Sequence, residues 1–122
     1  MGGRGTYALG KNVAQSYKTI DTICGVKVLE GIGDTKGLPV ESHTSNAYIQ
    51  LHADGKFKMY REYDADHYLI KEIAYHPEPK LAGNHLPILH IHEYNKDDFH
   101  NREPRLLTAA EYEKYKKFFK GL

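Results

Sequence analysis

The sequence predicts an α+β fold: an antiparallel β-meander sheet of about four to five strands, with a C-terminal amphipathic helix packed on one face. Three observations predict it. Residues 47–52 alternate between apolar and polar side chains, as half-buried strands do. Asp54-Gly55 follows them, and this pair is typical of a tight β-hairpin turn. Near the end of the chain, residues 108–111 read Thr-Ala-Ala-Glu, the pattern of a helix capping box.

The strands are expected in chain order. The β-branched run 17–29 predicts one or two short strands, and a long loop follows over 31–46. Residues 47–52, 57–63 and 68–75 then predict three consecutive antiparallel strands joined by short turns. Pro77 and Pro79 end the third of these strands, and residues 87–94 predict another one. Simple alternation would place Phe57 on the same face as Met59, and Leu69 on the same face as Ile73.

The closing helix is predicted to be amphipathic. The residues expected on its buried arc are Tyr112, Tyr115, Phe118, Phe119 and Leu122. Lysines at 114, 116, 117 and 120 fall on the opposite arc, where we expect a solvated face.

Size and composition restrict the class of protein. The chain has 122 residues, and we divide it into a flexible glycine-rich leader, 1–16, and a single α+β domain, 17–122. The formal net charge is +1, so no chain-wide basic field indicates nucleic-acid binding. Cys24 is the only cysteine, which excludes an internal disulfide and favours a reducing compartment. We expect this thiol to be buried, and we expect no membrane segment and a cytoplasmic location.

Histidine is concentrated in one part of the chain. Of the eight histidines, five lie between residues 76 and 100: His76, His85, His90, His92 and His100. On a strand, His90 and His92 project to the same face, with their Cα atoms about 7 Å apart. Three interpretations of this cluster fit the sequence.

The first interpretation is a metal site. His90 and His92 could bind one zinc-like ion, with His76, His85 or Glu72 as a third ligand. A His-x-His pair is a weak motif by itself, and the sequence contains neither a cysteine ligand set nor His-Glu-x-x-His.

The second interpretation is metal-free acid–base catalysis, most naturally cleavage of RNA. One histidine would accept the 2′-hydroxyl proton and the other would protonate the leaving oxygen, because the pKa of histidine lies near neutral pH. Arg61, Arg102 or Arg105 could stabilise the charge that develops on phosphorus. In the third interpretation the histidines are hydrogen-bonded scaffold residues on a tyrosine-rich sheet face.

Three segments stand in order along the chain, at residues 58–64, 72–77 and 89–94, and residues 102–108 and the closing helix follow them. This series resembles a family of small phage and prophage proteins. The pattern is also similar to C-terminal domains of phage head-morphogenesis (minor head) proteins, where a Gly-Gly-Arg-Gly stretch like residues 2–5 occurs. Some relatives look like toxin-type nuclease domains of the barnase/EndoU-like class. The resemblance implies an α+β architecture.

The positions of this chain that match the family's polar pattern are Arg61, His76, His90, His92 and Arg102. We therefore expect a phage- or prophage-encoded protein whose activity, if it is an enzyme, is a metal-independent ribonuclease-type reaction. In it His90 and His92 form the acid–base pair and Arg61 stabilises the phosphorane. No cofactor is expected, the expected partners are RNA or a phage structural protein, and the expected locations are the host cytoplasm or the virion. The alternatives are a non-enzymatic virion-associated or protein-interaction module and a metal-binding domain.

Overall fold

The computed structural model describes residues 17–32, 37–38, 45–94 and 103–122. The predicted leader, 1–16, lies outside these residues. The strands are β1 (Tyr17–Ile23), β2 (Val26–Gly31), β3 (Ala47–Leu51), β4 (Phe57–Tyr63), β5 (Leu69–Pro77) and β6 (Pro87–Glu93). The helices are α2 (Pro79–Ala82), α3 (Ala109–Tyr115) and the 3₁₀ turn η1 (Lys116–Phe118).

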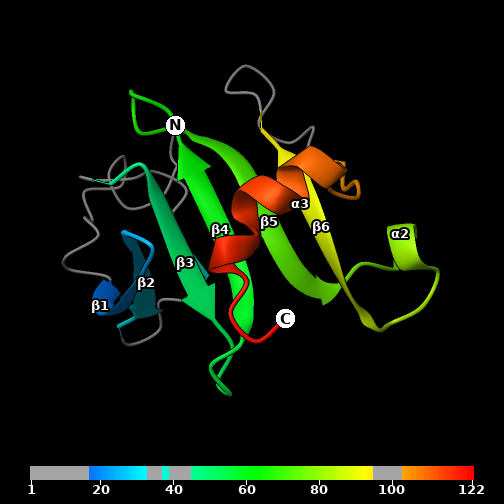
Figure 1. Cartoon of the computed structure of the whole chain (residues 1–122), viewed down its shortest axis with the longest axis horizontal. Coiled ribbons are helices and arrows are strands. Elements are labelled where there is room, and N and C mark those ends of the chain that lie inside the picture. Colours follow the sequence, from blue (N-terminus) through cyan, green and yellow to red (C-terminus); the bar gives the residue numbers. More distant parts are fainter. Residues whose placement is uncertain (1–16, 33–36, 39–44, 95–102) are drawn as a thin grey trace.

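The strands form one sheet in the order β1-β2-β3-β4-β5-β6, so each strand lies beside its neighbour in sequence (Figure 1). The α+β prediction is confirmed, but in the described part of the chain the sheet has six strands rather than four to five. It is also not antiparallel throughout, because β2 and β3 pair in parallel. The chain between these strands, 32–46, is long enough to return to the same end of the sheet, as a parallel pair requires.

The turn between β1 and β2 contradicts one expectation. Cys24 is exposed rather than buried. Cys24 and Gly25 both have positive φ, 49° and 84°, as in the tight turns whose twist matches paired strands. Because Cys24 lies in the turn itself, its side chain is at the end of the hairpin and is open to solvent.

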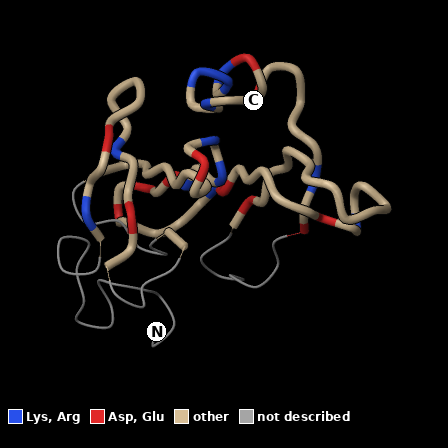
Figure 2. Tube along the Cα trace, turned by 90° about the horizontal axis from the view of Figure 1, so that it is seen from below, with Lys and Arg blue, Asp and Glu red and all other residues tan. Residues whose placement is uncertain are grey.

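The C-terminal helix forms a second layer over one face of the sheet (Figure 2). Its capping box is present: the Thr108 hydroxyl accepts from the Glu111 amide, and the Glu111 carboxylate accepts from the Thr108 amide. Tyr115, Phe118 and Phe119 are buried against the sheet, as predicted. Tyr112 and Leu122, which are predicted on the same arc, are exposed instead. Leu122 lies beyond the end of η1, where the chain is no longer helical.

The helix-side core consists mainly of β-branched and aromatic residues. Tyr60 stacks on Phe118 with ring centroids 5.0 Å apart, and Phe57 meets Phe119 at 4.8 Å. Ile73 and Ile91 of the central strands are fully buried in the same cluster. The opposite face has a second cluster, which comprises Tyr17, Leu29, Leu38, Tyr48, Tyr63 and Leu69.

Two irregularities correct the predicted strand faces. The register shifts between β3 and β4 at Gln50/Leu51, and Phe57 therefore joins the helix-side core, away from Met59. A second shift lies between β4 and β5 at Glu62/Tyr63, and Leu69 accordingly lies on the face opposite Ile73. Each bulge inserts a residue and reverses the faces beyond it.

Candidate functional site

The sheet register brings the predicted polar residues onto the face opposite α3. Arg61 of β4 pairs with Glu72 of β5, and Glu72 in turn pairs with His92 of β6. One step along the strands, Ala74 lies opposite His90. Ile73 and Ile91 point into the helix-side core, so their sequence neighbours Glu72, His90 and His92 must point the other way.

His90 is the most buried polar residue of the cluster, with an exposed fraction of 0%. Its Nδ1 lies 2.7 Å from the carbonyl oxygen of Ile88. A carbonyl can only accept a hydrogen bond, so Nδ1 carries the proton and Nε2 presents a lone pair. Burial lowers the pKa of His90, which favours this neutral form at neutral pH.

The Nε2 atom of His90 has no hydrogen-bond partner. Among the residues that the structure describes, it is one of two buried side-chain polar atoms in this condition; the other is Oε1 of Gln50. Burying a polar atom without a partner costs about 1–3 kcal/mol. Such an atom in a histidine cluster is therefore a candidate ligand atom.

Two more imidazoles contact His90. The rings of His76 and His90 are 4.7 Å apart, and those of His90 and His92 are 5.1 Å apart. Both pairs are nearly perpendicular, with interplanar angles of 82° and 83°. The prediction that His90 and His92 share one face of an extended strand is confirmed, and the terminal helix does not cover this face.

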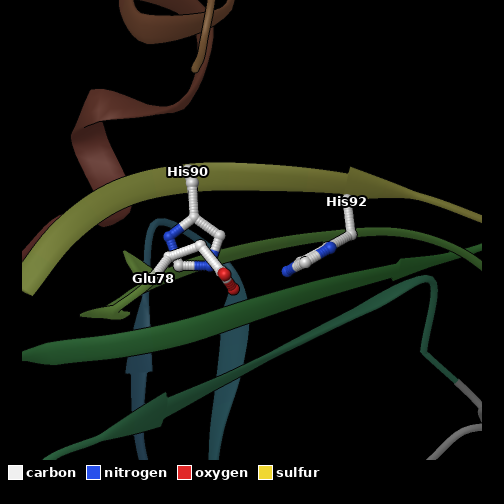
Figure 3. A group of neighbouring side chains, drawn as sticks. All are labelled: Glu78, His90 and His92. Atoms are coloured by element: carbon white, nitrogen blue, oxygen red, sulfur yellow. The ribbon is translucent and has the colours of Figure 1, made fainter. Parts of the chain in front are cut away.

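A carboxylate completes the group. Glu78, just before α2, His90 and His92 each offer one ligand atom, and these atoms all lie within 4.8 Å of one another. Figure 3 shows the two rings projecting from the same side of β6, with the Glu78 carboxylate beside them. Atoms bound to one ion at about 2.1 Å lie about 3.4 Å apart at tetrahedral angles and about 4.2 Å apart across it. Small side-chain rotations would therefore bring all three within bonding distance.

Beside this group lies a buried ion pair. Arg61 Nε and Nη2 both contact Oε1 of Glu72 at 2.7 Å, and Nη1 donates to the Leu38 carbonyl at 2.8 Å. The side chains of Arg61 and Glu72 are only 15% and 7% exposed. Burial alone would lower the pKa of Arg61, but the Glu72 carboxylate and nearby tyrosines raise it by more. The Arg61 guanidinium therefore keeps its charge at this depth.

The same carboxylate also faces the histidines, since Oε2 of Glu72 lies 4.0 Å from Nε2 of His92. The ion pair and the His90–His92 group are thus adjacent on one face of the sheet.

Of the predicted site residues, the structure brings together Arg61, His76, His90 and His92. Arg102 lies outside the described residues, as does His100. His85 is exposed and is not in the three-residue group. Arg105 instead binds Glu93 and Glu111 beside the helix N-terminus, which ties that helix to β6.

Glu78 is a site residue that was not predicted from the sequence. The sequence feature that could have indicated Glu78 is its position two residues after His76. Two residues that far apart point to the same face of the sheet as long as the chain stays extended. At Glu78 the backbone is still nearly extended, with φ −140° and ψ 84°.

The chain matches no known protein family, and it has no significant match among curated proteins or solved structures. In the part of the chain that is described, no helix has the length and apolar character needed to cross a bilayer.

Proposed function

We propose that this protein binds a divalent transition-metal ion through Glu78, His90 and His92. The observation that carries the proposal is the buried Nε2 of His90, which lacks any partner and lies in a ring held by the Ile88 carbonyl. In metal-binding histidines the second ring nitrogen characteristically donates to a carbonyl or carboxylate, which fixes the tautomer and the ring orientation.

The donor set favours particular ions. It contains two imidazoles and one carboxylate, the ligands common to zinc and to non-haem iron(II), and no thiolate. Calcium and magnesium prefer sites made entirely of oxygen, so they fit this set poorly. Zinc is the first ion to test.

The experiment is a zinc titration of tag-free, metal-stripped protein by calorimetry, with a competing chelator to measure tight binding. We expect one equivalent to bind, and we expect His90→Ala and Glu78→Gln each to weaken binding by at least about tenfold. His85→Ala is the matched control, because this histidine is exposed and lies outside the group. Equal affinity in the His90 variant and the wild type would overturn the proposal.

A second candidate function is the metal-independent cleavage of RNA predicted from the sequence. It is supported by the two perpendicular imidazoles 5.1 Å apart and by an arginine on the same face. In this reaction one ring accepts the 2′-hydroxyl proton, the other protonates the leaving oxygen, and Arg61 offsets the charge on phosphorus. The full exclusion of His90 from solvent favours the metal proposal over this one.

Mixed RNA incubated with the protein in EDTA separates the two candidates. Cleavage that persists in EDTA and is lost in the His90→Ala/His92→Ala double variant would favour acid–base chemistry. Absence of cleavage, together with zinc binding, would leave the metal function alone. The resemblance to phage proteins, and a role as a virion-associated interaction module, remain predictions that co-purification with phage structural proteins would test.

A further inference from the structure

We infer that His76 is a fourth ligand of the proposed ion, so that the occupied centre is a closed, tetrahedral, zinc-type structural site. This inference rests on the proposed function, because it adds a ligand to the group of Glu78, His90 and His92. It also assigns the site a class, since structural zinc sites use four protein ligands and catalytic sites keep one position for water.

Ring spacing is the first observation that points to His76. Two imidazoles that share one ion at about 2.1 Å have ring centroids about 4.5–5.2 Å apart, for angles at the metal between a right angle and the tetrahedral angle. His76 lies 4.7 Å from His90, and His92 lies 5.1 Å from His90. Each neighbour therefore lies at a ring spacing from His90 that a shared ion allows.

The second observation is the tautomer of His76. Its Nδ1 lies 2.9 Å from the carbonyl oxygen of Pro77, and it must donate there because a carbonyl only accepts. When the ring is neutral, Nε2 therefore presents a lone pair, as it does in His90. In both of these neighbouring histidines a backbone carbonyl thus holds Nδ1 and leaves Nε2 as the nitrogen with a lone pair.

His76 does not lie in the group whose ligand atoms are within 4.8 Å, so its side chain must rotate to bind. The ring is only partly buried, and no core cluster includes it. Rotation therefore changes the ring contact with His90 and the hydrogen bond to Pro77, but it does not disturb either core cluster.

Glu72 is the competing fourth ligand, and its existing contacts argue against it. Oε2 of Glu72 is 4.0 Å from His92, but Oε1 is held by two guanidinium nitrogens at 2.7 Å. Moving this carboxylate onto an ion would weaken a buried pair and leave the Arg61 charge less compensated, which is costly at such depth.

The positions of the four residues in the fold indicate the effect of binding. His76 is at the end of β5, Glu78 begins the connection, and His90 and His92 lie on β6. An ion bound to all four would fasten the β5–β6 connection, including α2, to the sheet. Because no coordination position remains for water, this ion would stabilise the fold and would not activate a nucleophile.

The test uses the full chain loaded with cobalt(II), which takes the place of zinc and has a visible spectrum. Each ligating histidine that keeps an N–H proton gives one exchangeable, paramagnetically shifted proton signal. We expect three such signals in the wild type and two in His76→Ala. We also expect added azide to change the spectrum of His76→Ala only, because that variant alone has an open position. His85→Ala is the matched control and should behave as the wild type.

Each possible outcome either supports or overturns the assignment of His76 as a ligand. The inference is supported if the wild type gives three signals and does not respond to azide, while His76→Ala gives two signals and does respond. Two signals in the wild type, or a wild-type spectrum that azide changes, overturn it while leaving metal binding intact. Absence of cobalt and zinc binding overturns the proposed function itself and this inference with it. Folding of the variants is checked by the near-UV circular dichroism of the metal-free proteins.

Discussion

Replacement of His90 by leucine gives the sharpest test of the buried imidazole, because it should act in opposite directions on the metal-free and the metal-bound protein. Leucine is close to histidine in volume, so the substitution neither opens a large cavity nor overpacks the face. It removes the unpartnered Nε2, whose burial costs about 1–3 kcal/mol, and the Nδ1–H bond to Ile88, worth about 0.5–1.5 kcal/mol. The metal-free variant should therefore be more stable than the wild type by about 1 kcal/mol.

With zinc the order should reverse. An ion that binds only the folded state stabilises it by about 2.7 kcal/mol when its free concentration is a hundred times Kd. For a chain of this size that corresponds to a rise in Tm of about 10 °C. His90→Leu should lose this rise, because its ligand atom is gone.

Thermal unfolding followed by calorimetry, in EDTA and in excess zinc, measures both effects. His85→Leu is the control, since the same substitution at an exposed histidine should leave the zinc-dependent rise unchanged. A metal-free His90→Leu protein less stable by more than about 2 kcal/mol would show that Nε2 was already satisfied. A zinc-dependent rise equal to that of the wild type would show that this ring is not a ligand.

Three further predictions concern the ion pair beside the site and the rest of the fold. Arg61→Ala removes the partner of the buried Glu72 carboxylate and should lower the free energy of unfolding by about 3–5 kcal/mol in urea titrations. Lys18→Ala breaks an exposed ion pair and should change this free energy by less than about 1 kcal/mol. Equal effects of the two substitutions would contradict the argument from burial. The hydrogen bond from Arg105, and to a smaller extent the one from the Thr108 backbone, hold the pKa of Glu111 at about 2, below its value in the unfolded chain. The ionised carboxylate therefore stabilises the fold above about pH 4.5, and this stabilisation is lost as the pH falls toward 2. Urea titrations at pH 5 and pH 2.5 should accordingly show a smaller acid loss in Glu111→Gln than in the wild type, and parallel losses would refute this linkage. Gly55→Ala forces a Cβ into φ +88° and should cost about 1–2 kcal/mol, although the Cβ itself meets open space; a neutral result in the same titrations would mean that the turn relaxes.

The site could be predicted from the sequence only where local periodicity decides the geometry. His90 and His92 are two positions apart on a strand, and a period of two places both on one face whatever the register. The capping box at Thr108 and Glu111 is equally local, and it formed as predicted. Alternation gave the wrong face for Phe57 and Leu69, because a β-bulge depends on the register between two strands and not on the sequence of one strand.

What depends on distant pairing could not be predicted in this way. The contact of Arg61 with Glu72 follows from the register between β4 and β5, and the parallel pairing of β2 and β3 joins strands that a long stretch of sequence separates. Glu78 could not be predicted because the prolines on either side of it indicate only the end of a strand. In the structure, the chain keeps the face alternation for two residues beyond His76.

The two faces of the sheet differ in a way that itself indicates function. One face is closed by an aromatic helix, and among the described residues the two buried polar or charged ones, Glu72 and His90, are both on the other face. On the other face, a buried carboxylate, a largely buried guanidinium and a fully buried imidazole occupy neighbouring positions of three adjacent strands. Apolar side chains there would avoid both the desolvation of the ion pair and the unpartnered nitrogen of His90. The ion pair compensates its own charges, but the imidazole is left with a lone pair that no described side chain satisfies. A ligand that accepts electron density from that nitrogen would remove the remaining cost, and a metal ion held between His90, His92 and Glu78 does so with residues already in place.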